Sequence, residues 1–129
     1  MAEPSLSLSV LPDVFAVCRL APEMPVPAWA TGALVSITHT AEELSIVCAQ
    51  DQVPEAIQCE RGWRCLKVAG PLAFSLIGVL AALAAPLAQA GVSLFAISAY
   101  DTDYLLVKET DLERAIQALS QAGHHIEPG

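Results

Sequence analysis

The stretch from Gly70 to Lys108 constrains the fold more than any other part of the chain. It begins with a Gly-Pro turn signal and continues into a run whose large apolar residues recur at helical spacing. This apolar stripe comprises Leu76, Val79, Leu80, Leu83, Leu87 and Ala90. Gly91 can end the helix, because a residue without a side chain adopts a positive φ at little cost. Two strand-like runs follow, at 93–99 and 104–108, so the stretch predicts a helix and a β-hairpin.

The residues on either side extend this pattern. A strand is expected at 62–69, directly before the Gly-Pro turn. After Lys108, the run Thr110-Asp111-Leu112-Glu113 fits a capping box at the start of a second helix. Gly123 can end that helix, and a last strand is expected at 124–127. From Arg64 onward the predicted order is therefore β-α-β-β-α-β.

The first half of the chain predicts strands without a long helix. Alternating or apolar runs indicate strands at 5–10, 14–20, 33–39 and 43–48, and a single helical turn fits within 51–56. Three prolines between residues 22 and 27 exclude a regular helix there, and Trp29 is expected to reach the core from this loop.

Shifting the chain by 60 residues places similar residues over one another, such as Ile46-Val47 over Leu106-Val107. The sequence therefore predicts two related α+β units, residues 1–61 and 62–129. The first would have a reduced first helix, and an exchange of strands between the units is left open.

Composition excludes several functions. The net charge is −8, with six Lys and Arg against fourteen Asp and Glu, which disfavours nucleic acid and anionic membranes as partners. The apolar run at 72–92 has the length of a membrane span, but it is rich in Ala, contains Pro86 and Gln89, and lacks a basic flank. No secretory leader pattern is present at the start, so a cytoplasmic protein is expected.

The four cysteines give no metal or cofactor signal. No pair has the C-x-x-C spacing of a zinc site, and Cys18 and Cys48 lie in apolar runs where a thiol is usually a core residue. Cys59 and Cys65 are close enough in sequence that a cross-link between them is left open. Neither a metal nor a cofactor is expected.

The predicted order and the turn chemistry resemble a known family. The segment ISAYDTDYLLVKETDLE, and more broadly 70–119, resembles the second domain of small bacterial-type tandem ACT-domain proteins related to the CASTOR arginine sensors. The run VSITHTAEELSIVC resembles their first domain. This resemblance implies tandem ferredoxin-like βαββαβ units, with antiparallel sheets covered by helices on one face.

The resemblance also implies a regulatory ligand sensor that holds an amino acid between two turns. The first turn contains Gly70, Pro71, Leu72, Ala73, Phe74 and Ser75, and the second contains Ser98, Ala99, Tyr100, Asp101 and Asp103. Family members that bind arginine have acidic groups near the first turn. This chain has Ala73, Phe74 and Ser75 there, which speaks against arginine as the ligand. A homodimer or a regulated protein is the implied partner.

Elementary chemistry is compatible with this site. Amides at a helix N-terminus suit an α-carboxylate, Asp103 suits an ammonium group, and Phe74 and Tyr100 can wall an apolar side chain. Simpler interpretations stay open: the two aspartates as turn residues, the two aromatic residues as core residues, and His39 as a surface histidine at a strand end. No nucleophile elbow or phosphate loop is present, so an enzyme is not expected. The alternative function is an interaction protein that keeps the fold without a pocket.

Overall fold

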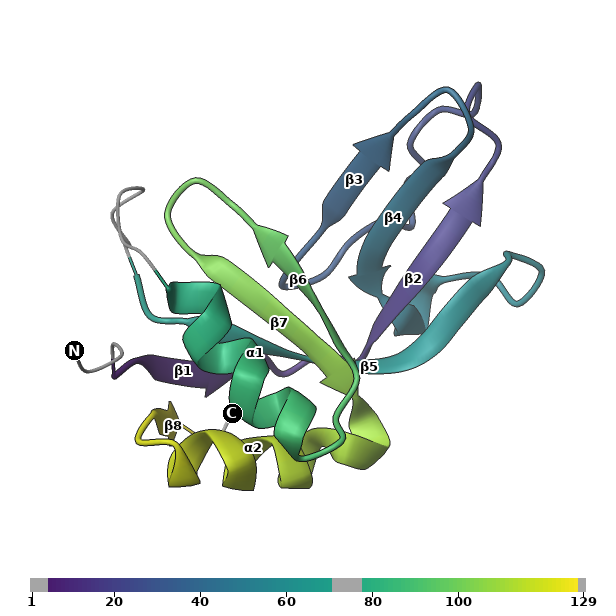
Figure 1. The fold of residues 1–129 in the computed structure, drawn as a ribbon. Helices are drawn as coiled ribbons and strands as arrows, with labels where there is room; N and C mark the ends of the chain where they lie inside the picture. Colours follow the sequence, from purple (N-terminus) through teal and green to yellow (C-terminus); the bar gives the residue numbers. More distant parts are fainter. Residues whose placement is uncertain (1–4, 71–77, 128–129) are drawn as a thin grey trace. The chain divides into compact units, whose positions relative to one another are not determined.

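The computed structural model describes residues 5–70 and 78–127, and it confirms the predicted α+β fold with eight strands and two α-helices in that part of the chain (Figure 1). The elements in order are β1 (Ser7–Val10), β2 (Phe15–Leu20), β3 (Ser36–His39), β4 (Leu44–Ala49), the 3-10 turn η1 (Gln50–Gln52), β5 (Cys59–Val68), α1 (Val79–Gln89), β6 (Leu94–Ser98), β7 (Asp103–Lys108), the 3-10 turn η2 (Glu109–Asp111), α2 (Leu112–Gln121) and β8 (His125–Glu127). No helix in the described part of the chain is long and apolar enough to cross a membrane.

The chain divides into two compact units. Unit 1 comprises Met1–Leu11 and Arg64–Gly129, and unit 2 comprises Pro12–Trp63. The strand β5 belongs to both, because its first residues pair with β2 and its last residues pair with β1. The sequence-based division at residues 61 and 62 differs from this one in the placement of the first eleven residues. Its interpretation as two repeated domains stays a prediction.

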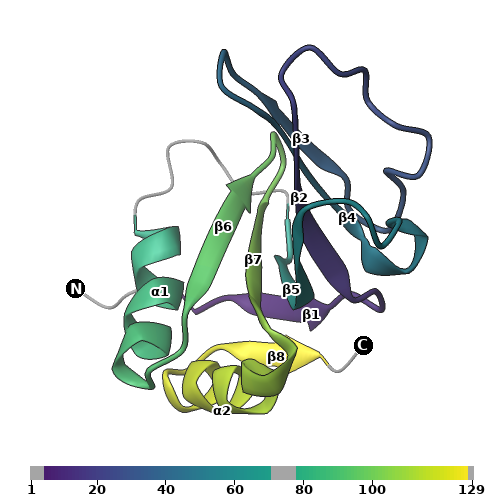
Figure 2. The same cartoon turned by 90° about the vertical axis from the view of Figure 1, so that its right-hand side faces the viewer.

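Unit 1 has strands in the order β6-β7-β5-β1-β8. The predicted hairpin is confirmed, since β6 and β7 pair antiparallel from Leu94 and Val107 to Ser98 and Asp103 (Figure 2). The buried faces of both helices pack with the strands in one core, built from Leu8, Val10, Leu66, Val68, Val79, Leu83, Leu87, Leu105, Val107, Ala115 and Leu119, with other apolar residues around it. Gly91 ends α1 with a φ of +75°, as predicted.

Unit 2 has antiparallel strands in the order β3-β4-β2-β5 and no α-helix, and the structure describes all of its residues. One face of the sheet carries a core made by Ala16, Cys18, Leu44, Ile46, Cys48 and Val53. Trp29 and Ala30 pack against this core from the proline-rich loop, as predicted for Trp29. The loop therefore covers the sheet in the way a helix would.

The two hairpins repeat the same local structure. The Thr40 amide donates to the Glu43 carbonyl at 2.9 Å, and the Ala99 amide donates to the Thr102 carbonyl at the same distance. His39 pairs with Leu44, and Ser98 with Asp103, so that equivalent residues are 59 positions apart. The offset of 60 predicted from the sequence is one residue too long. An alignment with the offset of 60 would match side chains that lie on opposite faces of their strands.

A buried histidine joins three segments of unit 1. Pro86 lies inside α1 and has no N–H, so the carbonyl of Ala82 lacks its usual helical partner. The His124 Nε2–H donates to that carbonyl at 3.2 Å, and the Leu6 amide donates to His124 Nδ1 at 3.1 Å. In this arrangement Nδ1 is the acceptor and Nε2 is the donor. His124 thus links α1, the start of β1 and the start of β8.

The predicted capping box is wrong. Thr110 lies inside η2, and the residue that precedes α2 is Asp111, which makes no side-chain hydrogen bond to the helix amides. Its carboxylate instead accepts from Arg114 at 2.7 Å. The 3-10 turn directly after β7 moves the helix start past the position that the box requires.

Substitution of His124 by Ala should lower the free energy of unfolding by about 3 kcal/mol, because it leaves two buried polar groups without partners. His125→Ala is the control and should change it by less than about 0.5 kcal/mol, since that side chain is exposed. Urea denaturation measures both values.

Pro86→Ala restores an N–H for the Ala82 carbonyl. In that background, the cost of His124→Ala should therefore fall by about 1 kcal/mol. An unchanged cost would show that the hydrogen bond from His124 to the Ala82 carbonyl does not contribute to stability.

Candidate functional site

Gly70, the described residue of the first predicted turn, lies against the second predicted turn in unit 1. A Cβ atom added at Gly70 would lie 3.0 Å from the Thr102 Cβ and 3.1 Å from the Asp101 carbonyl oxygen. The end of β5 therefore runs directly against the turn between β6 and β7, and this close approach favours glycine at position 70. Pro71, Leu72, Ala73, Phe74 and Ser75 lie outside the described residues.

Thr102 holds the second turn against the first, and sequence reasoning missed it. Its side chain is buried, and its hydroxyl donates to the Val68 carbonyl at 2.6 Å. Its carbonyl accepts from the Ala99 amide at 2.9 Å. The sequence could have indicated this role, because Thr102 lies between two aspartates in a turn, where a hydroxyl commonly bonds to the backbone.

The remaining residues of the second turn differ in exposure. Ser98, Ala99 and Asp101 are exposed, and Tyr100 is 79% exposed. The alternative that Tyr100 is a core residue is therefore wrong. Asp103 is half-buried where β7 begins, which places one carboxylate at the base of the turn.

The described part of α1 begins beyond these turns. Gly78 precedes the helix with a φ of +83°, and the Ala82 amide donates to the Gly78 carbonyl at 2.8 Å. The amides of residues 79–81 come before this bond, so the helix presents the donor groups typical of an N-terminus. The predicted start at Leu76 lies outside the described residues.

The corresponding end of unit 2 is closed by hydrogen bonds. The Nε2–H of His39 donates to the Pro22 carbonyl at 2.8 Å, so the hairpin is tied to the loop that follows β2. The guanidinium of Arg19 donates to the Glu42 carbonyl at 3.0 Å. His39 is exposed at the end of β3, as its simpler interpretation predicted.

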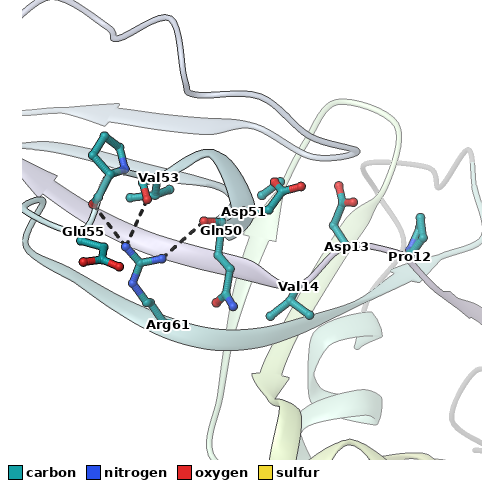
Figure 3. Close-up of a pocket in the computed structure, with 10 residues that line it drawn as sticks. Pro12, Asp13, Val14, Gln50, Asp51, Val53, Glu55 and Arg61 are labelled. Atoms are coloured by element: carbon teal, nitrogen blue, oxygen red, sulfur yellow. Dashed lines mark hydrogen bonds between the residues drawn. The ribbon is translucent and has the colours of Figure 1, made fainter.

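Unit 2 has a groove that the sequence did not indicate (Figure 3). Its volume is about 700 Å³, and it is lined by Pro12, Asp13, Val14, Ala49, Gln50, Asp51, Val53, Pro54, Glu55 and Arg61. The guanidinium of Arg61 points into the loop after η1 and donates to the carbonyls of Gln50, Val53 and Pro54 at 3.3–3.4 Å (Figure 3).

The polar side chains of this groove hold loops in place. Asp13 accepts from the Ala33 amide at 2.7 Å, and the side-chain carbonyl of Gln50 accepts from the Gly62 amide at 2.9 Å. Together with Arg61, these contacts fix the connections at one end of the unit 2 sheet. The polar side chains that line the groove therefore serve to stabilise the fold.

The structure also describes the possible metal ligands and the cysteines. Within residues 5–70 and 78–127, no group of His, Cys, Asp and Glu is arranged to hold a metal ion. All four cysteines are free. Cys59 and Cys65 lie on the same extended strand, so their Cα atoms are roughly 20 Å apart and cannot form a disulfide.

Comparison with known proteins divides the chain in a similar way. A family model described as an ACT domain matches residues 58–121, and a model of an N-terminal domain matches residues 13–56. The cytosolic arginine sensor for mTORC1 subunit 1 from Homo sapiens is 37% identical over 60 residues, which are 46% of this chain and 18% of the sensor subunit. The chain thus spans less than a fifth of that relative.

Solved structures match over the whole chain. Protein Atu0741 from Agobacterium tumefaciens is 38% identical, with a TM-score of 0.92 over 98% of this chain and 96% of that one. Aspartate kinase from Synechocystis has the same fold over 95% of this chain and 28% of the kinase, at 20% identity and a TM-score of 0.68. Protein VC0802 from Vibrio cholerae has a TM-score of 0.76 at 19% identity, over 92% of this chain and 91% of that one.

Thr102→Val should lower the free energy of unfolding by about 1–2 kcal/mol, because the buried Val68 carbonyl loses its hydroxyl donor while the side-chain volume is kept. Thr110→Val is the matched control on the exposed η2 turn and should change it by less than about 0.5 kcal/mol. Denaturant titration of the three proteins tests this. Equal effects of the two substitutions would contradict the role of Thr102.

Proposed function

We propose that this chain, which belongs to the ACT-domain family, is a non-catalytic regulatory protein that senses an amino acid. The proposed site consists of residues 70–75 and 98–103 of unit 1. The observation that carries this proposal is the close approach of Gly70 to Asp101 and Thr102, which supports a site formed by the two turns. The similarity to an arginine sensor subunit and the fold shared with aspartate kinases support a regulatory role.

Each part of an amino acid has a chemically suitable group at this site. The half-buried carboxylate of Asp103 would accept from the α-ammonium, since a charged pair shielded from water forms a strong hydrogen bond. The N-terminal amides of α1 would donate to the α-carboxylate. Phe74 and Tyr100 would border the side chain. Thr102 would keep the turn in the geometry that the ligand needs.

The ligand that we favour has an uncharged side chain. The turn at residues 70–75 contains no acidic residue, and the second turn supplies Asp101 and Asp103. If Asp103 binds the α-ammonium, only the exposed Asp101 remains for a cationic side chain. Arginine should therefore bind more weakly than an apolar amino acid.

We also propose that the protein acts in the cytoplasm as a homodimer or bound to a regulated protein. Tyr100 is 79% exposed, and a large amphipathic ring at the rim of a site is well suited to contact a second chain. The same exposure favours the second candidate function, an interaction protein that has kept the fold without a working pocket. Ligand binding separates the two functions.

A thermal-shift screen of the twenty amino acids at millimolar concentration, run beside a turnover assay, tests the proposal. A ligand at a hundredfold excess over its Kd stabilises the folded state by about 2.7 kcal/mol. One or a few amino acids with uncharged side chains should therefore raise the melting temperature by several degrees, and no product should form.

Asp103→Ala should abolish this shift. Glu43→Ala is the matched control, because it removes a carboxylate from the corresponding hairpin of unit 2 and should leave the shift intact. A shift that persists in Asp103→Ala would place the site elsewhere. If no amino acid stabilises the wild type, the interaction function takes the place of the sensor function.

A further inference from the structure

Three cysteines that are far apart in the sequence come together in unit 2. Cys18 lies on β2, Cys48 on β4 and Cys59 on β5, and all three belong to or contact the same apolar core. Burial, followed by the neighbouring Cys48 and Cys59 thiols, raises the pKa of the Cys18 thiol to about 12. Cys65 is also buried and free, but it belongs to unit 1.

The pairing of β2 and β5 places Cys18 directly opposite Cys59. The next pair along is hydrogen-bonded, since the Arg19 amide donates to the Gln58 carbonyl at 3.0 Å. Hydrogen-bonded and non-hydrogen-bonded pairs alternate in antiparallel strands, so Cys18 and Cys59 form a non-hydrogen-bonded pair. The Cα atoms of such a pair are about 4.5 Å apart, which lies within the range that a disulfide spans.

Cys48 is less well placed for a disulfide. It pairs with Ala16 on β2, two residues before Cys18, so the two cysteines are diagonal neighbours. Diagonal neighbours are about 7–8 Å apart, beyond the usual Cα separation of a disulfide. The thiols of Cys18 and Cys48 also contact each other. The register of the sheet nevertheless favours Cys59 as the partner of Cys18.

A small oxidant can reach this pair. A surface depression of about 200 Å³ is lined by Val17, Cys18, Arg19, Glu43, Ser45, Gln58, Cys59 and Glu60. Cys59 is half-buried, whereas Cys18 is 1% exposed. Access therefore favours Cys59 as the first thiol to react and Cys18 as the second.

We propose that Cys18 and Cys59 form a reversible thiol–disulfide pair that is oxidised by a low-molecular-weight disulfide of the glutathione type. The Cys59 thiolate attacks one sulfur of the oxidant and releases one thiolate, which leaves a mixed disulfide on Cys59. Cys18 then loses its proton and attacks the Cys59 sulfur, which releases the second thiolate. Two protein thiols lose two electrons and two protons, and the oxidant is reduced to two thiols.

This modification site is independent of the proposed amino-acid function, since it lies within unit 2 and uses no residue of the turns in unit 1. The disulfide would tie the start of β5 to β2. It closes a long loop that contains all of β3 and β4, so oxidation should stabilise unit 2 by restricting its unfolded state.

The test uses the full chain, reduced first and then incubated with oxidised glutathione. Remaining thiols are alkylated, and the digested protein is analysed by mass spectrometry. We expect one cross-link that joins the peptides containing Cys18 and Cys59, with Cys48 and Cys65 alkylated after unfolding. The melting temperature should rise by several degrees on oxidation and return after reduction with dithiothreitol.

Cys59→Ser should prevent both the cross-link and the rise in melting temperature, whereas Cys65→Ser, the control, should preserve both. Serine at the half-buried position 59 avoids a change in the fully buried part of the core, so a folding defect does not obscure the result. A glutathione adduct on Cys59 without a cross-link would overturn the proposal. So would a cross-link to Cys48 or Cys65, or a wild-type chain that stays fully reduced.

Discussion

The architecture of unit 1 depends on one missing amide hydrogen. Pro86 leaves the Ala82 carbonyl unpaired inside α1, and a buried carbonyl without a partner would be costly. His124 supplies the donor and at the same time accepts from the Leu6 amide. Because Pro86 frees the Ala82 carbonyl, His124 can connect the residue before β1 and the start of β8 to α1. Parallel pairing of β1 with β8 follows directly beyond these contacts.

The same sheet positions the candidate site. Val68, at the end of β5, pairs with Leu8 of β1 and also accepts from the Thr102 hydroxyl. The turn between β6 and β7 is therefore tied to the strand that precedes Gly70. The position of Thr102 beside Gly70 is therefore set by buried backbone contacts of the core.

Sequence patterns predicted most of the elements because apolar periodicity is a local property. Val79, Leu83 and Leu87 of the predicted stripe are buried, whereas Leu80 is 39% exposed and Leu76 lies outside the described residues. The glycine that ends α1 and the β6–β7 hairpin were predicted correctly. Pairing between distant strands was harder to predict from the sequence. For example, β5 begins at Cys59, earlier than predicted, because its first residues pair with β2. Thr102 and His124 were missed as organising residues for a similar reason, since their partners lie 34 and 42 or more positions away. Of the candidate site, the approach of Gly70 to the second turn agrees with the prediction, whereas the exposure of Tyr100 could not be predicted.

The two units differ in what covers the sheet and in the contacts made at the hairpin end. In unit 1, helices cover the sheet, and the turn at the end of β5 meets the hairpin through Gly70 and Thr102. In unit 2, the side chains of His39 and Arg19 bond to the backbone at the corresponding end. A loop replaces the helices there, and small thiols share the core beneath it with Trp29. In unit 2, a surface depression lined by Cys18 and Cys59 brings this thiol pair within reach of the solvent.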